Sequence, residues 1–152
     1  MSTKKIVPVI LAAGKGTRMI SDTPKVLHTL VSKPMVEYAL DLASNISNTL
    51  PVVVLGFESD KVEQVIGNRA RVVIQKEQLG TGHALNQTSS VLMDQADLIL
   101  VWAADMPLLS CEILDSIIKC QLNNDGPISM VTAESKNHRG FGKIIRTEQD
   151  EV

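Results

Sequence analysis

Short apolar runs rich in β-branched residues alternate along this chain with longer stretches of helical periodicity, and this alternation constrains the fold more than any other feature. The apolar runs predict buried strands at residues 6–11, 52–55, 71–75, 98–103 and 128–132, and a last short strand at 142–145. Strands that alternate with helices favour a three-layer α/β domain with a mainly parallel sheet. In such sheets, ligands bind at the carboxyl ends of the strands.

The stretches between the strands carry the signals of helices. Apolar spacing predicts helices at residues 35–43, 59–66, 82–93 and 111–122. Ser59 and Ser110 are expected as N-caps, because a serine hydroxyl can accept a hydrogen bond from a backbone N–H of the first turn. Gly67 and Asn68 are expected to end the second of these helices.

Size, charge and composition limit the classes of partner. A length of 152 residues suits one domain, and a hydrophobic content of 44% is enough for a core. The net charge of −2 provides no global field that favours nucleic acid or an anionic membrane, and the aromatic content of 3% argues against base stacking. No apolar run reaches the length of a membrane span. We therefore expect neither nucleic acid nor a membrane as a partner.

Two features bear on the compartment of the protein. Lys4 and Lys5 precede an apolar run, as in a signal peptide, but Pro8 interrupts this run and a buried first strand is favoured. Cys111 and Cys120 fall on opposite faces of the predicted helix, because nine residues turn through about 900°. They cannot easily pair, so a reducing cytoplasm is the simplest location.

The segment after the first predicted strand, residues 11–19 (LAAGKGTRM), has the composition of a phosphate-binding loop. Gly14 and Gly16 lack side chains, so backbone amides can approach a phosphate closely. Arg18 can span two phosphate oxygens, and Lys25 adds further positive charge to a chain that is acidic overall. The alternative is an ordinary turn after a strand.

Two common phosphate motifs do not fit this segment. A Walker loop requires Ser or Thr after the lysine, but Lys15 is followed by Gly16. A dinucleotide-binding fingerprint requires a third glycine at the position of Met19, which makes an NAD-dependent dehydrogenase a distant alternative.

A second polar segment, residues 75–84 (QKEQLGTGHA), follows the third predicted strand and opens a helix. The Gln75 amide both donates and accepts hydrogen bonds, which suits the edge of a pyrimidine. Gly80 allows close backbone contact, and Thr81 is expected either to hydrogen-bond the base or to cap the helix. His83 is expected to pack or cap within the same helix. A plain strand-to-helix connection with a threonine cap is the alternative.

Two further segments offer a metal ligand and a sugar pocket. Asp105 follows the strand at 98–103, and its carboxylate suits Mg²⁺ whose other ligands are triphosphate oxygens. A turn residue before Pro107 is an equally good interpretation of Asp105 alone. Residues 139–143 (RGFGK) could shape a sugar pocket, although a turn with Phe141 in the core is favoured when this segment is considered by itself.

Together these segments resemble the uridylyltransferase domain of the bifunctional bacterial N-acetylglucosamine-1-phosphate uridylyltransferase/glucosamine-1-phosphate acetyltransferases. The resemblance spans nearly the whole chain and rests on residues 11–19, 24–28 (PKVLH), 33–35 (KPM), 75, 77–84 (EQLGTGHA), 105, 107–108 and 140–142 (GFG). Many nucleotidyltransferases share the first stretch, whereas QLGTGHA is far more specific to this group. The resemblance implies a Rossmann-like nucleotidyltransferase fold.

The resemblance also implies roles for single residues and a reaction. The nucleotide would be bound by Leu11, Ala12, Gly14, Lys25, Gln75, Gly80 and Thr81, of which the last three would contact uracil. Arg18 and Lys25 would be catalytic, Ala103 and Gly140 would contact the sugar, and Asp105 would hold Mg²⁺. The implied reaction converts UTP and N-acetylglucosamine 1-phosphate into UDP-N-acetylglucosamine and pyrophosphate, a step toward peptidoglycan of the cell wall.

Two departures from this family leave alternatives open. Ala103 and Ala104 stand where the family usually shows Tyr-Gly, which removes an aromatic contact and adds a methyl group that would narrow the sugar site. In the family, the domain continues beyond the point that matches Val152, and an acetyltransferase β-helix that forms the oligomer follows. We therefore expect residues 1–152 to be a single domain, incomplete at its C-terminus. The alternatives are a UTP-binding module without turnover, and a cytidylyltransferase or another sugar nucleotidyltransferase.

Overall fold

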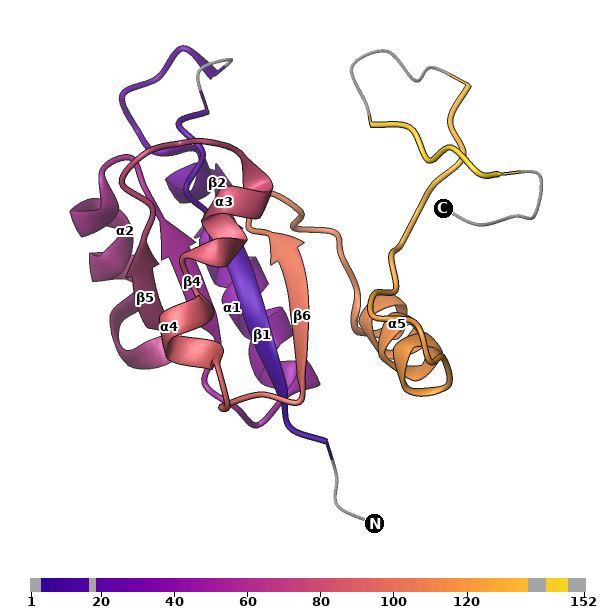
Figure 1. The fold of residues 1–152 in the computed structure, drawn as a ribbon. Coiled ribbons are helices and arrows are strands. Elements are labelled where there is room, and N and C mark those ends of the chain that lie inside the picture. Colours follow the sequence, from indigo (N-terminus) through magenta and orange to yellow (C-terminus); the bar gives the residue numbers. More distant parts are fainter. Residues whose placement is uncertain (1–3, 17–18, 137–141, 148–152) are drawn as a thin grey trace.

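A parallel sheet of four strands forms the centre of the computed structural model, which describes residues 4–16, 19–136 and 142–147 (Figure 1). The strands are β1 (Ile6–Ala12), β4 (Val52–Leu55), β5 (Arg71–Ile74) and β6 (Leu98–Ala103), in the spatial order β5-β4-β1-β6. On β1, Ile10 is in register with Val53 on one side and with Trp102 on the other. These four strands confirm the sequence prediction, with β1 one residue longer and β5 one residue shorter.

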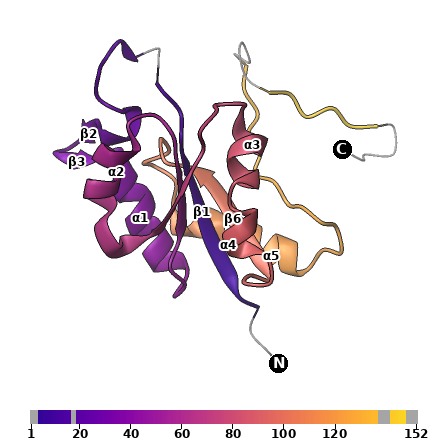
Figure 2. The same cartoon turned by 60° about the vertical axis from the view of Figure 1, so that its left-hand side comes forward.

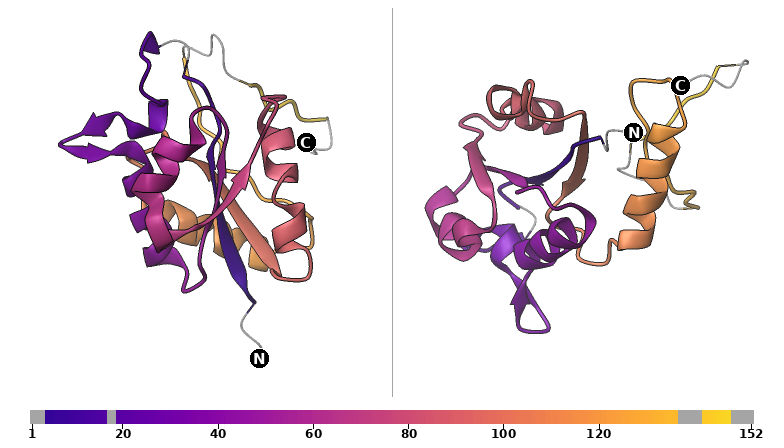
Figure 3. Two further views of the ribbon diagram at one scale, coloured as in Figure 1. Left: turned by 90° about the vertical axis from the view of Figure 1, so that its left-hand side faces the viewer. Right: turned by 90° about the horizontal axis from the view of Figure 1, so that it is seen from below.

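Helices cover both faces of this sheet and complete the three layers that the sequence predicts. One face carries α1 (Met35–Ile46), α2 (Ser59–Ile66) and α5 (Cys111–Leu122), and the other carries α3 (Thr81–Asn86) and α4 (Ser89–Leu92) (Figure 2). In the left view of Figure 3, α3 and α4 lie on the side of the sheet opposite α1 and α2. The right view shows α5 on the side of β6.

The side chains of β1 divide between two hydrophobic clusters. Ile10 and Ala12 belong to the cluster beneath α1 and α2, whereas Val7 and Val9 belong to the cluster beneath α3 and α4. Because both faces of a parallel strand are covered, the strand must be apolar along its whole length rather than at alternate positions. This requirement explains the continuous run of valine, proline and isoleucine at its centre.

A small hairpin lies outside the sheet and follows the short 3₁₀ helix η2 (Lys25–Leu27). Its strands are β2 (Thr29–Leu30) and β3 (Lys33–Pro34), which pair in antiparallel fashion. Lys33 in the hairpin and Arg69 in the 3₁₀ helix η3 (Gly67–Arg69) both form ion pairs with Asp41 on α1. Burial by itself raises the pKa of Asp41, but the hydrogen bonds and charges of Lys33 and Arg69 outweigh it and lower this pKa.

The predicted helices are present, and α1 and α5 begin at the predicted residues, whereas the caps of α2 and α3 differ from the prediction. Ser59 is the first residue of α2 rather than its cap, since Glu58 takes the N-cap position with a positive φ of 50°. Thr81 is likewise the first residue of α3 and follows Gly80 at the N-cap, so the prediction that Thr81 caps this helix is wrong. Ser110 does occupy the N-cap of α5, without a side-chain capping hydrogen bond. The predicted single helix at 82–93 is divided into α3 and α4.

Two predicted strands are not formed. Residues 128–132 and 142–145 have no regular secondary structure, and Ile128 is 76% exposed. An apolar, β-branched sequence becomes a strand only where a neighbouring strand offers hydrogen bonds. Ile128 and Ser129 reach the groove beside β6, yet within the described residues β6 pairs with β1 alone. These residues therefore lie beside the outer edge of β6 but form no ladder with it.

Both cysteines have free thiols, as their spacing predicts: Cys111 is half-buried and Cys120 is exposed. Within the described ranges, no helix is both long enough and apolar enough to cross a bilayer.

Two isoleucines test where the core ends. We expect Ile10→Ala to lower the free energy of unfolding by about 2–5 kcal/mol, because this side chain is completely buried between the strands and α1. The same change at the exposed Ile128 should alter it by less than about 0.5 kcal/mol. Urea unfolding followed by circular dichroism measures both. A large loss with Ile128→Ala would indicate that this segment belongs to the core after all.

Candidate functional site

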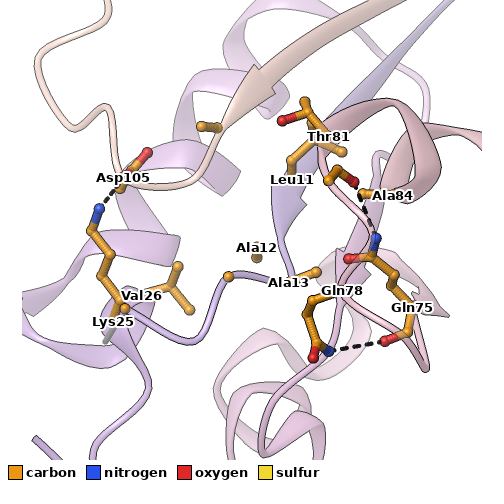
Figure 4. A pocket seen from close by; sticks show the side chains of 14 residues that line it. Leu11, Ala12, Ala13, Lys25, Val26, Gln75, Gln78, Thr81, Ala84 and Asp105 are labelled. Atoms are coloured by element: carbon orange, nitrogen blue, oxygen red, sulfur yellow. Dashed lines mark hydrogen bonds and ion pairs between the residues drawn. The ribbon is translucent and has the colours of Figure 1, made fainter. Parts of the chain in front are cut away.

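A cavity of about 390 Å³ opens at the carboxyl ends of the parallel strands. It is lined by the end of β1 and the loop after it, by η2, by the segment between β5 and α3, and by the residues that follow β6 (Figure 4). The lining includes Leu11, Ala12, Gly14, Lys25, Gln75, Gly80, Thr81, Ala103 and Asp105. These are all the predicted site residues that fall within the described ranges. Residues as far apart in the sequence as Leu11 and Asp105 thus meet at one place.

The loop after β1 passes directly against η2. Gly16 has a positive φ of 63°, and a Cβ atom on it would lie only 2.7 Å from Cβ of Lys25. Only glycine combines that backbone conformation with that close approach. Gly14 has no such neighbour within 4 Å. Gly16 therefore serves to bring Lys25 against the loop, which is a different role from the open backbone that the sequence suggested for both glycines.

Lys25 and Asp105 form an ion pair across the mouth of the cavity (Figure 4). The two side chains come from η2 and from the loop after β6, and they are 29% and 33% exposed. Such partly solvated pairs contribute little to stability. Both groups therefore remain available to other partners: an ammonium group for an anion, and a carboxylate for a cation.

The carboxylate of Asp105 is a hard oxygen ligand, but it does not belong to a cluster of metal-binding side chains in the described residues. Within the part of the chain that the structure describes, no three His, Cys, Asp or Glu side chains lie together as a metal-binding group. Mg²⁺ in enzymes is commonly held by one or two carboxylates together with phosphate oxygens and water. The residues present therefore fit a metal ion that arrives with a phosphate ligand, better than one bound by protein alone.

Gln75 forms the opposite wall of the cavity and is only 3% exposed. Its backbone N–H extends the sheet by donating to the carbonyl of Leu55 at 2.7 Å. Its side-chain nitrogen lies 3.2 Å from the carbonyl oxygen of Gly80 and 2.9 Å from Nδ1 of His83. The amide is thus held in one orientation at the edge of the cavity.

Two further residues support this wall, and the sequence analysis assigned them no role in the site. Gln78 lines the cavity and donates to the backbone carbonyl of Gln75 at 3.4 Å. Gly56 comes directly after β4, and a Cβ atom there would lie 2.7 Å from the carbonyl oxygen of Ala13. A glycine immediately after a buried strand was the available signal for this close approach.

The two alanines at the end of β6 and directly after it differ in direction. Ala103 lines the cavity. Ala104 is 1% exposed and packs in the hydrophobic cluster with Ile10, so its methyl group does not narrow the cavity as the sequence suggested. Lys15 is exposed and lies over the ring of Phe57, with 6.0 Å between its nitrogen and the ring centroid, and it does not line the cavity. Arg18, Gly140 and Phe141 lie outside the described residues.

The sequence of this chain matches the MobA-like NTP transferase domain over residues 8–147. It is 37% identical over 144 residues to the bifunctional protein GlmU of Oceanobacillus iheyensis, and 42% identical over 144 residues to that of Streptococcus sanguinis. Each alignment covers 95% of this chain, but 32% and 31% of the relative. The chain thus spans about a third of the length of these relatives.

Solved structures share the fold at lower identity. Rv0371c from Mycobacterium tuberculosis H37Rv superposes with a TM-score of 0.68 and 24% identity, covering 80% of this chain and 62% of that one. A manganese complex of the same protein superposes with a TM-score of 0.64 and 22% identity, covering 77% of this chain and 59% of that one. A UDP-glucose pyrophosphorylase complexed with UDP-glucose superposes with a TM-score of 0.60 and 21% identity, covering 78% of this chain and 55% of that one. The Rossmann-like nucleotidyltransferase fold is therefore confirmed.

The two glycines of the loop after β1 provide a matched test of the site geometry. Gly16→Ala should lower the free energy of unfolding by about 1–3 kcal/mol, because it adds a side chain at positive φ and forces Lys25 aside. Gly14→Ala should change it by less than about 0.5 kcal/mol, since no atom lies within 4 Å of the added methyl group. Thermal and urea unfolding measure both. Equal effects would contradict the close contact between Gly16 and Lys25.

Proposed function

This chain belongs to the family of MobA-like NTP transferase domains, and we propose that it transfers a uridylyl group from UTP to N-acetylglucosamine 1-phosphate. The observation that carries this proposal is the convergence of Gln75, Lys25 and Asp105 on one cavity at the carboxyl edge of the sheet. A base contact, a phosphate contact and a metal ligand are the three groups that a nucleoside triphosphate with its metal ion requires. The products would be UDP-N-acetylglucosamine, a precursor of peptidoglycan, and pyrophosphate.

The choice of substrates rests on the resemblance described from the sequence and on the relatives. The segment QLGTGHA lies in the wall that holds Gln75, and it is the most specific part of that resemblance. The two GlmU proteins are 37% and 42% identical to the chain. Because the chain spans about a third of their length, turnover by these 152 residues is part of the proposal. Free thiols at Cys111 and Cys120 suit the reducing cytoplasm, where UTP is available.

The proposed reaction needs little covalent help from the protein. An oxygen of the sugar phosphate, already anionic, attacks the α-phosphorus of UTP, so one P–O bond forms while the bond to the leaving pyrophosphate breaks. The protein must align these groups and neutralise the charge that grows on pyrophosphate. Arg18 and Lys25 supply positive charge for this purpose. Asp105 would hold Mg²⁺, which supplies charge stabilisation at the phosphates; manganese bound to Rv0371c supports a divalent ion in this fold.

One observation favours a second candidate, a module that binds UTP without turnover. The cavity has Ala103 where the resembling family usually has tyrosine. Calorimetry with UTP and Mg²⁺ alongside an assay of pyrophosphate release separates the two candidates. Binding with no release in the presence of N-acetylglucosamine 1-phosphate would favour the module. Release with CTP but not UTP would favour a cytidylyltransferase.

Asp105 provides the first prediction for turnover. Asp105→Asn should lower the rate of pyrophosphate release by about 100-fold and raise the Mg²⁺ concentration needed for half-maximal rate, because the amide is a weaker ligand than the carboxylate. Asp115→Asn is the matched control, since Asp115 is exposed on α5, away from the cavity. An unchanged metal titration in Asp105→Asn would remove Asp105 from the metal site.

Arg18 provides a second prediction. Arg18→Ala should lower kcat by about 100-fold while UTP affinity falls by less than about tenfold, because the charge on pyrophosphate develops mainly in the transition state. Arg69→Ala is the control, since Arg69 pairs with Asp41 outside the cavity. Steady-state kinetics and calorimetry with UTP give the two quantities. Equal losses in both would indicate that Arg18 acts by ground-state binding alone.

A further inference from the structure

The side-chain amide of Gln75 has both of its N–H groups committed inside the protein. One contact leads to the carbonyl oxygen of Gly80, 3.2 Å away, and the other to Nδ1 of His83, 2.9 Å away. An amide nitrogen has only two hydrogens to donate. Neither hydrogen is therefore left for a ligand in the cavity.

The oxygen of the same amide is in the opposite situation. Among the described residues no group donates a hydrogen bond to Oε1 of Gln75, although the side chain is almost completely buried. Gln75 lines the cavity, so Oε1 is the atom of this amide that can meet a ligand there. In Figure 4 the nitrogen of Gln75 lies toward the start of α3, and the oxygen lies on the other side of the amide. Gln75 thus offers the cavity an acceptor.

His83 can hold this orientation only in one proton arrangement. To accept from Gln75, Nδ1 must be unprotonated, so the neutral imidazole carries its proton on Nε2. Nε2 lies 3.1 Å from the amide of Gln87. The nitrogen of Gln87 also donates to the carbonyl oxygen of His83 at 3.1 Å, but Gln87 is only partly buried, so water can replace this contact when its oxygen turns toward the proton. A turned Gln75 would place its oxygen against the carbonyl oxygen of Gly80, and at 3% exposure it has little access to water that could relieve this contact.

We propose that His83 is a positioning residue that sets the base specificity of this site by fixing the Gln75 amide with its oxygen toward the ligand. The inference rests on the proposed function and deepens it. A fixed acceptor suits a base that presents a ring N–H, as uracil does at N3. Cytosine has an unprotonated, accepting N3 at the same ring position, which would leave two acceptors facing each other.

The role of His83 is to prevent the oxygen and the NH₂ group of the Gln75 amide from exchanging places. A Gln75 side chain that turned by 180° would present its NH₂ group to the ligand and would suit cytosine instead. Buried polar groups that are left unpaired are the strongest source of discrimination between similar ligands. Without the acceptor at His83, one N–H of Gln75 loses its buried partner, and only the contact with the carbonyl oxygen of Gly80 still opposes the turned state. The observable quantity is therefore the ratio of the affinities for UTP and CTP.

Titration calorimetry with UTP and with CTP, each with Mg²⁺, tests this in four proteins: the unmodified chain, His83→Leu, His83→Asn and Asn86→Ala. The UTP/CTP affinity ratio should fall about tenfold in His83→Leu, which has no acceptor. It should recover to within about threefold in His83→Asn, whose Oδ1 can replace Nδ1 as the acceptor. Asn86→Ala, exposed on the same helix, should leave the ratio unchanged.

Each outcome decides a different claim. An unmodified chain that binds UTP no better than CTP overturns the proposed base, and this inference with it. A preference for UTP that persists in His83→Leu overturns the inference and leaves the proposed function intact. Equal losses in the Leu and Asn variants would show that a structural role, not the acceptor, matters. Since a ratio refers to the folded molecules of one sample, partial unfolding does not imitate a loss of specificity.

One measurement needs no variant. ¹⁵N NMR of histidine-labelled protein, at a pH where the ring of His83 is neutral, distinguishes a bare nitrogen from a protonated one. We expect an unprotonated Nδ1 and a protonated Nε2 at His83. A proton on Nδ1 would contradict the proposal directly, because Gln75 could not then donate to that atom.

Discussion

The pairing of β1 with β4 on one side and with β6 on the other is the interaction on which the rest of this structure depends. It buries the centre of β1 between two layers of helices and brings the carboxyl ends of all three strands to one edge. The loop after β1, the loop after β6 and Gln75, which continues the ladder from β5, must then lie around a common space. The cavity is therefore a consequence of parallel pairing, not of any single motif.

Much of the fold follows from local patterns in the sequence. The strands that form the sheet are short, continuously apolar and separated by amphipathic helices, and these signals need no knowledge of distant contacts. Residues 128–132 carry the same local signal and do not form a strand, since strand formation also depends on hydrogen bonds with a neighbouring strand, which these residues do not make with β6. Glu58 at positive φ was equally unpredictable, because serine is a much better N-cap by propensity than a left-handed glutamate.

The sequence indicated which types of residue would line the cavity, but not which contacts those residues would make with one another. Glycines, cations, an amide and a carboxylate near strand ends indicated which groups a ligand would meet. The pairing of Lys25 with Asp105, and the close approach of Gly56 to Ala13, join residues far apart in the sequence and depend on strand register. His83 was expected to pack or cap, yet it holds the Gln75 amide. Such supporting contacts become visible only when the backbone is known, although they decide what the first contacts can do.

In the proposed site, a ligand that binds Lys25 or Asp105 must replace the other member of their ion pair. Free metal ion at Asp105 would release an ammonium group without an anion, and free triphosphate at Lys25 would release a carboxylate without a cation. A metal–nucleotide complex brings both replacements at once, so charge stays balanced while each old partner is exchanged for a new one. The complete complex therefore leaves neither charge of the old ion pair without a partner.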